Sequence, residues 1–276
     1  MPAINPIVLN SLSDLQPALY WLDADPLEPD SHSSLTSEIE TDLCIVGAGY
    51  TGLWTALLAK ERDPKREVVI IEQRETGNGA SGRNGGFCNG SLTHGFVNGY
   101  TRFADEMVTI EKLGRQNLDA IEETIKKYKI DCDFERNGEL RVAVAPWQMA
   151  GLKEEAVARN KTGDQVEVLS KEEIRALVKS PIYEGALFDH DGTALVDPAR
   201  LVWGLEKVCL SLGVKIYENS KVEELIQDGD QVIVKSAYGS IRANKVALAT
   251  NIYTPLVKSV KKYVIAVYDF QLVTQP

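Results

Sequence analysis

A glycine pattern between an apolar segment and a helical one constrains this chain more than any other feature. The hexapeptide GAGYTG at residues 47–52 follows the apolar run LCIV and opens a segment whose leucines recur at helical spacing. A second apolar run, VVII at residues 68–71, comes soon after. We predict strand, helix and strand. Because the connection is short and both strands are apolar, we expect a parallel pair with a right-handed crossover, the beginning of an open α/β sheet.

The spacing of these glycines predicts a dinucleotide-binding turn. Gly47 allows a tight turn, Gly49 lets a pyrophosphate approach N–H groups at the helix N-terminus, and Gly52 lets helix and strand pack closely. Glu72 lies 20 residues after Gly52, at the end of the second strand, where it can accept hydrogen bonds from both ribose hydroxyls. An acid there disfavours a 2′-phosphate, so NADP is the poorest fit. The motif does not separate NAD from FAD.

Charge and cysteine content exclude several classes of partner. Among 276 residues, 30 Lys and Arg stand against 40 Asp and Glu, a formal net charge of −10. Such a surface repels a phosphate backbone, so we expect no nucleic-acid or membrane partner. The four cysteines show no CxxC spacing, which argues against a disulfide framework or a zinc site. No Lys or Arg precedes Lys60, so we expect no targeting segment and a cytoplasmic location.

A second glycine-rich stretch identifies the family that the chain resembles. Residues 75–90 read ETGNGASGRNGGFCNG, too rich in glycine for a helix or strand interior. Within it, GASGRNGGF at residues 79–87 resembles the flavin-contacting loop of the D-amino-acid oxidase-like (DAO) family of FAD-dependent oxidoreductases, most closely its γ-glutamylputrescine oxidase-like branch. YWLD at residues 20–23 and the late pattern SKVEELI…VIV…GSIRANKVALATNIYTP agree with this. The resemblance is strongest over residues 42–90 and 196–254.

The resemblance implies which residues contact FAD, held non-covalently. Ser81 and Arg83 would lie along the pyrophosphate, and residues 84–86 would approach the ribityl chain and isoalloxazine. Val222 would read the adenine edge through its backbone, and Asn251 stands where many relatives have glycine. Relatives that attach FAD through a loop histidine have it near Arg83, so that linkage is excluded. The full predicted set is Gly47, Ala48, Gly49, Tyr50, Thr51, Gly52, Glu72, Gln73, Arg74, Ser81, Gly82, Arg83, Asn84, Gly85, Gly86, Val222, Thr250 and Asn251.

The predicted architecture is a discontinuous Rossmann-like FAD/NAD(P)-binding α/β domain with an α+β substrate domain, in a p-hydroxybenzoate hydroxylase-like layout. Residues 1–41 form an extended leader, residues 42–95 and 195–252 the FAD-binding domain, and residues 96–194 and 253–276 an incomplete substrate domain. We also expect a long helix over 101–128, a helix capped by Ser170 and Glu173, an Asp-Gly hairpin at 228–230 and a buried strand at VALAT. Strand-like sequence at the very end suggests that a C-terminal portion is absent, so we expect this chain alone to bind FAD weakly with negligible turnover.

The resemblance implies oxidation of a C–N bond in a small-molecule amine or amino acid, with hydride passing to flavin N5 and oxygen giving hydrogen peroxide. A flavin dehydrogenase with another electron acceptor, or a flavin-binding module without turnover, remains an alternative, and an NAD-dependent dehydrogenase comes last. No catalytic residue is assigned, and the three histidines form no metal set.

For several residues near the flavin loop and elsewhere, a functional and a structural interpretation are both consistent with the sequence. His94 and Cys88 follow the flavin loop, yet a surface histidine and an inert buried thiol are the commoner outcomes. His190 fits turn chemistry. Phe96, Tyr100 and Arg102 fit a substrate entrance or ordinary packing equally well.

Overall fold

The computed structural model describes residues 20–24, 31–252, 256–265 and 267. Backbone packing divides the chain into a first unit, residues 1–83 and 213–276, and a second unit, residues 84–212. The predicted domain boundaries lie at 95/96 and 194/195 instead, and the assignment of cofactor and substrate to separate domains stays a prediction. Within the described residues, no helix is both long and apolar enough to cross a membrane.

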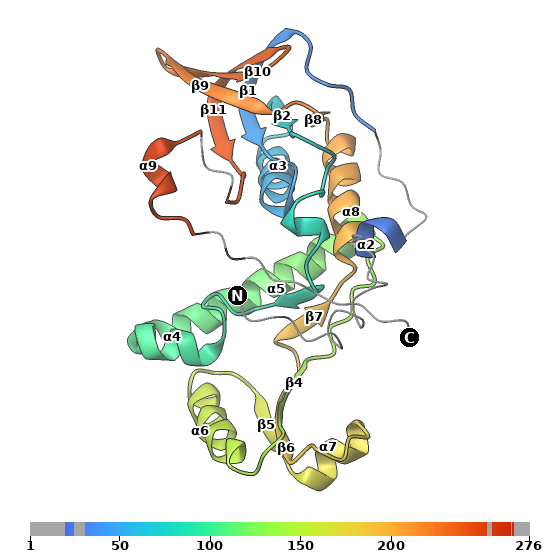
Figure 1. Cartoon of the computed structure of the whole chain (residues 1–276), viewed down its shortest axis with the longest axis vertical. Coiled ribbons are helices and arrows are strands. Elements are labelled where there is room, and N and C mark those ends of the chain that lie inside the picture. Colours follow the sequence, from blue (N-terminus) through green and yellow to red (C-terminus); the bar gives the residue numbers. More distant parts are fainter. Residues whose placement is uncertain (1–19, 25–30, 253–255, 266, 268–276) are drawn as a thin grey trace, which may run out of the picture. The chain divides into compact units, whose positions relative to one another are not determined.

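A six-stranded sheet forms the first unit (Figure 1). Its strand order is β8-β2-β1-β11-β10-β9. The pairs β8/β2, β2/β1 and β1/β11 are parallel, whereas β11/β10 and β10/β9 are antiparallel. The parallel pair predicted around the glycine hexapeptide is confirmed. The bounds are β1 (Glu38–Val46), β2 (Val68–Ile71), β8 (Lys215–Tyr217), β9 (Val222–Asp228), β10 (Gln231–Ser236) and β11 (Ser240–Leu248).

Helix α3 (Tyr50–Arg62) packs against β1 and β2 (Figure 1). Of the leucines at helical spacing, Leu58 lies off the buried face and is 42% exposed. Leu53, Ala56 and Leu57 are fully buried, and all four residues of β2 are buried. This arrangement fixes the N-terminus of α3 beside the ends of β1 and β2. The chemistry expected of the glycine turn depends on that placement.

The described part of the leader, residues 20–24 and 31–41, is not a simple extended segment on the surface. It contains a short helix, α2 (Tyr20–Ala24), and Leu35 is 1% exposed within the sheet's hydrophobic cluster. Strand β1 begins at Glu38, inside the predicted leader of residues 1–41, because Glu38 pairs in register with Ser240 of β11. The sheet therefore begins before residue 42, and the predicted domain boundary stays a prediction.

Two predictions for the antiparallel strands have different outcomes. The hairpin turn at Asp228–Asp230 is confirmed, with Gly229 at φ 60°. The VALAT segment, predicted as a buried strand, is only partly buried, because Leu248 is 42% exposed.

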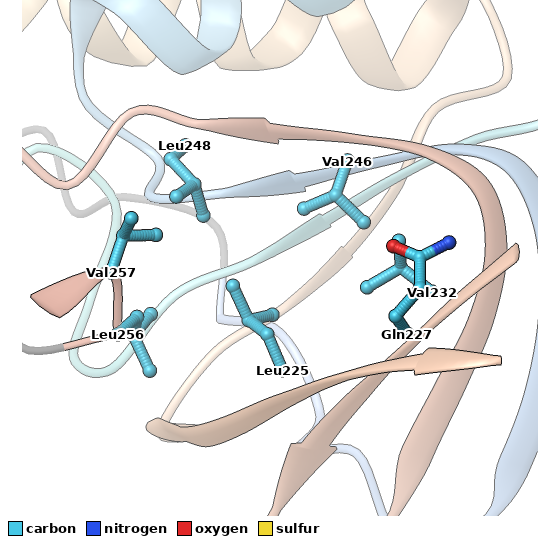
Figure 2. A pocket seen from close by; sticks show the side chains of 7 residues that line it. All are labelled: Leu225, Gln227, Val232, Val246, Leu248, Leu256 and Val257. Atoms are coloured by element: carbon cyan, nitrogen blue, oxygen red, sulfur yellow. The ribbon is translucent and has the colours of Figure 1, made fainter. Parts of the chain in front are cut away.

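The antiparallel strands also carry an apolar groove that the sequence did not predict. Val246 and Leu248 line this groove, which has a volume of about 350 Å³ and is shown in Figure 2. Its other lining residues are Leu225, Gln227, Val232, Leu256 and Val257, the last two preceding α9 (Lys258–Lys261).

The second unit contains two small antiparallel sheets and five α-helices in its described part. One sheet pairs β3 with β7, and the other has the order β4-β6-β5. Helix α6 packs against one face of the three-stranded sheet and α7 against the other, because the adjacent residues Leu187 and Ala186 of β6 join different clusters. The bounds are β3 (Phe87–Asn89), α4 (Phe96–Phe103), α5 (Met107–Tyr128), β4 (Glu139–Ala143), α6 (Gln148–Lys161), β5 (Val166–Leu169), α7 (Lys171–Leu177), β6 (Gly185–Asp189), β7 (Thr193–Leu195) and α8 (Pro198–Ser211).

Two helix predictions in this unit have different outcomes. The capping box is present at α7, where Ser170 and Glu173 each bond the other's backbone N–H. The helix predicted over 101–128 is interrupted: α4 ends at Phe103, a 3₁₀ turn spans Ala104–Glu106, and α5 begins at Met107. Phe103, at φ −136° and ψ 39°, leaves helical geometry and is exposed, so the apolar stripe starts at the buried Met107.

The predicted strand near the C-terminus falls largely outside the described residues. Val264 and Ile265, which are described, are not in a strand.

A charged network lies in the interior of the second unit. The Asp164 side chain is fully buried and accepts hydrogen bonds from both Arg115 and Arg159, and Arg159 also bonds Asp189. Glu111 on α5 is buried beside these groups. Burial, with Asp164 nearby, raises the pKa of the Glu111 carboxyl.

We therefore expect Glu111→Gln to change how stability depends on pH. A raised pKa means that the folded chain holds this proton more tightly than the unfolded chain, so stability falls as pH rises through the ordinary carboxyl pKa toward the raised one. At pH 8 the variant should melt above the parent, and the difference should shrink toward pH 4. Thermal unfolding between pH 4 and 8 measures this. Glu154→Gln, at an exposed position, is the control. If the melting temperatures of Glu111→Gln and of the parent depended on pH in the same way, the raised pKa of Glu111 would be contradicted.

Candidate cofactor site

The glycine turn is held together by close backbone contacts. A Cβ at Gly52 would lie 1.9 Å from the Gly47 carbonyl oxygen, so only glycine allows α3 to start this near the end of β1. Gly47 has φ 110°, and a Cβ there would lie 2.6 Å from the carbonyl oxygen of Ala249, after β11. Gly49 is the N-cap of α3. The first N–H groups of α3 therefore point out of the turn without intrahelical acceptors.

Glu72 reaches this turn from the end of β2. Its Oε2 accepts the N–H of Ala48 at 2.8 Å, and its Oε1 accepts the N–H of Arg74 at 3.0 Å. A carboxylate has about four acceptor positions, so two remain for ribose hydroxyls. The acid is thus fixed beside the glycine turn at the predicted position.

Ser81 brings the second glycine loop onto the same helix terminus. Its Oγ accepts the N–H of Tyr50 at 2.9 Å, 31 residues away in sequence. A Cβ at Gly49 would lie 2.8 Å from that Oγ, so the hydroxyl occupies the space which the glycine leaves. The N–H of Gly77 adds a bond to the Ala48 carbonyl at 3.1 Å. Gly82 is buried at the end of a 3₁₀ turn, Ala80–Gly82.

Other predicted contacts of this loop have local partners. Arg83 donates from Nε to the Asn78 carbonyl at 2.6 Å and from Nη2 to its side chain at 3.0 Å, so its guanidinium turns back on its own loop. Arg74 Nη1 donates to the same side chain at 3.4 Å. Gln73 is exposed. The predicted role of Arg83 along a pyrophosphate stays a prediction.

Three predicted residues belong to the second unit. The Asn84 side chain accepts the N–H of Gly86 at 2.9 Å in a local turn. Gly86 has φ 78°, and a Cβ there would lie 2.4 Å from the Val196 carbonyl oxygen. Gly85 is exposed. Gly86 thus serves a close backbone approach within the unit, and the contact of residues 84–86 with a flavin stays a prediction.

The late predicted contacts lie in the first unit. Val222 begins β9 and is buried in the sheet's hydrophobic cluster, with Ser236 opposite it. Thr250 and Asn251 follow β11, and Asn251 has φ 51°, a left-handed conformation that Asn tolerates. The N–H of Ala249 bonds the Val46 carbonyl at 2.9 Å, which places this segment beside the glycine turn.

The histidines, the aromatic residues and Cys88 that have both a functional and a structural interpretation lie in the second unit. His190 is exposed, with Nε2 3.3 Å from a carboxylate oxygen of Glu167. Phe96 is buried and stacks on Tyr100 with ring centroids 5.6 Å apart. His94 is exposed at φ 56°. Burial raises the pKa of the Cys88 thiol, which disfavours its reactive thiolate.

Sequence reasoning missed the residues that hold the second glycine loop. The Glu218 carboxylate, 2% exposed, accepts the N–H of Thr76 at 2.6 Å. Backbone bonds from Glu72 to Tyr217 and from Ser220 to Glu72 join the end of β8 to the end of β2. Glu218, the acid of YEN at residues 217–219, directly follows a short strand, as Glu72 does. This position was the only feature of the sequence that could have pointed to its role. Its partner, 142 residues away, could not be read from the pattern.

A comparison with protein families now identifies the class. The chain belongs to the DAO family of FAD-dependent oxidoreductases, whose model matches residues 42–276. FAD is the cofactor of this family, and the site's chemistry fits it. The N-terminus of α3 offers N–H donors to phosphate, Gly49 brings no side chain beside them and leaves that space to the Ser81 hydroxyl, and Glu72 offers acceptors for ribose.

Two curated relatives are similar to most of this chain. It is 31% identical over 254 residues to a probable oxidoreductase, OrdL, of Haemophilus influenzae, covering 88% of this chain and 57% of the relative. It is 37% identical over 230 residues to gamma-glutamylputrescine oxidoreductase of Escherichia coli, covering 80% and 51%. The chain therefore spans about half the length of these relatives.

Solved structures agree on the fold. Glycine oxidase from Bacillus cereus aligns with a TM-score of 0.65 at 20% identity, covering 80% of this chain and 58% of that one. L-amino acid deaminase from Proteus myxofaciens aligns with a TM-score of 0.65 at 22% identity, covering 83% and 48%. The predicted Rossmann-like α/β fold class is confirmed.

We expect Gly49→Val to abolish FAD binding. The branched side chain would displace the Ser81 hydroxyl and fill the space beside the first N–H groups of α3. Gly79→Ala is a matched control, because Gly79 has φ −78° and a Cβ there meets no atom within 4 Å. The ratio of flavin to protein after gel filtration gives the answer. Retention of flavin by Gly49→Val at the parent ratio would remove this turn from the pyrophosphate.

Glu72→Ala should weaken FAD binding by about 1 to 3 kcal/mol through lost charge-assisted hydrogen bonds. FMN lacks the adenosine ribose and should bind the variant and the parent equally. Titration of both flavins into apoprotein compares them, with exposed Glu75→Ala as control. An equal loss for FAD and FMN would mean that Glu72 acts on the fold and not on the ribose.

Proposed function

We propose that the protein oxidises a C–N bond of a small amine or amino acid, using non-covalent FAD. One observation carries the cofactor half of this proposal. Glu72 and Ser81, near the two ends of the loop of residues 72–83, accept the backbone N–H groups of Ala48 in the glycine turn and of Tyr50 at the start of α3. An acceptor for ribose hydroxyls and the N–H donors of a helix N-terminus thus lie in one place.

The chain's residues would bind and orient FAD and would do little acid-base chemistry. The proposed contacts are the hexapeptide 47–52, residues 72–74, residues 81–86, Val222, and residues 250–251. Bound flavin supplies the acceptor for a hydride from the carbon that bears the substrate nitrogen. The names of the relatives support an amine or amino acid as substrate: one acts on gamma-glutamylputrescine, and the solved structures include a glycine oxidase and an L-amino acid deaminase.

The electron acceptor distinguishes the alternatives. Oxygen as acceptor would give hydrogen peroxide, whereas a dehydrogenase would pass electrons to a carrier. L-proline dehydrogenase from P. horikoshii is also similar in fold, with a TM-score of 0.62 at 20% identity. Proteins named oxidase and proteins named dehydrogenase therefore share this fold, and the fold does not distinguish the two electron acceptors. We propose oxygen, with a carrier-linked dehydrogenase as the second candidate and a flavin-binding module without turnover as the third.

Reduction of bound flavin without oxygen tests the reaction class. The FAD-loaded protein is mixed with primary amines, N-methylated amines and amino acids, and with glycerol 3-phosphate as a hydroxyl-bearing comparison. Because we expect negligible turnover from this chain alone, the readout is a single reduction of the bound flavin. We expect slow loss of the flavin absorption band with at least one nitrogen compound, and no more peroxide than bound flavin when oxygen returns. Reduction by glycerol 3-phosphate alone would contradict C–N oxidation, and reoxidation by a dye but not by oxygen would favour the dehydrogenase.

A further inference from the structure

The leader motif YWLD at residues 20–23 has no role in the site described so far. It forms α2, and Leu22 of this helix lies over Gly82, in the loop assigned to FAD: a Cβ at Gly82 would be 3.0 Å from the Leu22 Cδ2. That Cβ would also be 2.6 Å from the carbonyl oxygen of Gly77, which accepts the Gly82 N–H at 3.0 Å. Gly82 therefore packs against the loop's own backbone on one side and is covered by Leu22 on another.

Glu218 ties the leader to the same loop at a second point. One carboxylate oxygen accepts the N–H of Thr76 at 2.6 Å, and the other accepts the N–H of His32 at 3.2 Å. The leader is also held by Ser220, whose Oγ accepts the N–H of the buried Leu35 at 2.8 Å. A buried carboxylate is costly unless it is hydrogen-bonded, and here the bonds satisfy backbone N–H groups of two irregular segments. One side chain thus joins segments that are far apart in sequence.

We propose that Leu22 and Glu218 are positioning residues for FAD, holding the loop of residues 72–83 from outside the glycine motif. The proposal rests on the assignment of this loop to FAD. Glu72 and Ser81 stand near the two ends of the loop, and both bond the start of α3. Leu22 and Glu218 act on the backbone between and beside them. If either is lost, the spacing of Glu72 and Ser81 is no longer fixed and FAD leaves faster.

Two conservative variants of the full chain test the proposal. Leu22→Ala removes the cover over Gly82, and Glu218→Gln places an amide NH₂ where a second acceptor is needed. Each has a matched control in the first unit. Leu225→Ala changes a half-buried leucine of the apolar groove, and Asp42→Asn changes a carboxylate that accepts the Glu67 N–H at 2.9 Å, away from the loop.

Two readouts separate positioning from general loss of stability. The first is the dissociation rate of FAD, followed by its fluorescence on release, with ADP titration into apoprotein alongside. The second is tryptic cleavage after Arg74 and Arg83, which are both exposed and lie on the loop. We expect both test variants to release FAD about tenfold faster and to be cut faster at the loop. The controls should lose comparable thermal stability without either change.

The outcomes also separate this proposal from the proposed function. Parent-like FAD release and parent-like loop cleavage in both test variants would overturn the positioning role. If the parent chain binds neither FAD nor ADP, the proposed function fails. Faster loop cleavage in the test variants would then still show that Leu22 and Glu218 hold the loop.

Discussion

The contact between Gly47 and Gly52 sets the position of the rest of the candidate site. With a Cβ at Gly52 only 1.9 Å from the Gly47 oxygen, no other residue lets α3 start against the end of β1. The helix terminus then lies within reach of both Glu72 and Ser81. Local N–H groups and the helix dipole favour a phosphate there, so a formal charge of −10 over the whole chain does not prevent anion binding at this point.

The glycine turn supplies donors, whereas the loop of residues 72–83 supplies acceptors and shape. Such a loop lacks the regular backbone hydrogen bonds of a helix or a sheet, so its buried N–H and C=O groups need partners elsewhere. Here the partners come from the end of β8 and from the leader, through Glu218 and through backbone bonds to residues 217–220. The cofactor site therefore depends on segments far outside the motif that identifies it.

Local patterns could be predicted from the sequence because each has a local physical cause. Glycine spacing predicted the βαβ turn, Asp-Gly predicted the β9–β10 hairpin, and Ser170 with Glu173 predicted a capped helix. Long-range effects were not accessible. Strand β1 extends to Glu38 because β11 pairs with it there, the helix break at Phe103 has no Gly or Pro to mark it, and the bond from Thr76 to Glu218 spans 142 residues. Catalytic residues were assigned neither from sequence nor from geometry.

Hydrogen exchange with and without FAD tests most directly whether the two glycine loops form one dinucleotide site. FAD should slow exchange of the amides in residues 48–53 and 72–83 together, because phosphate and ribose would bond or cover both segments. The hairpin around Gly229, at the far end of β9 and β10, should exchange at the same rate in both states. Protection confined to one loop, or protection of the hairpin without either loop, would contradict the account.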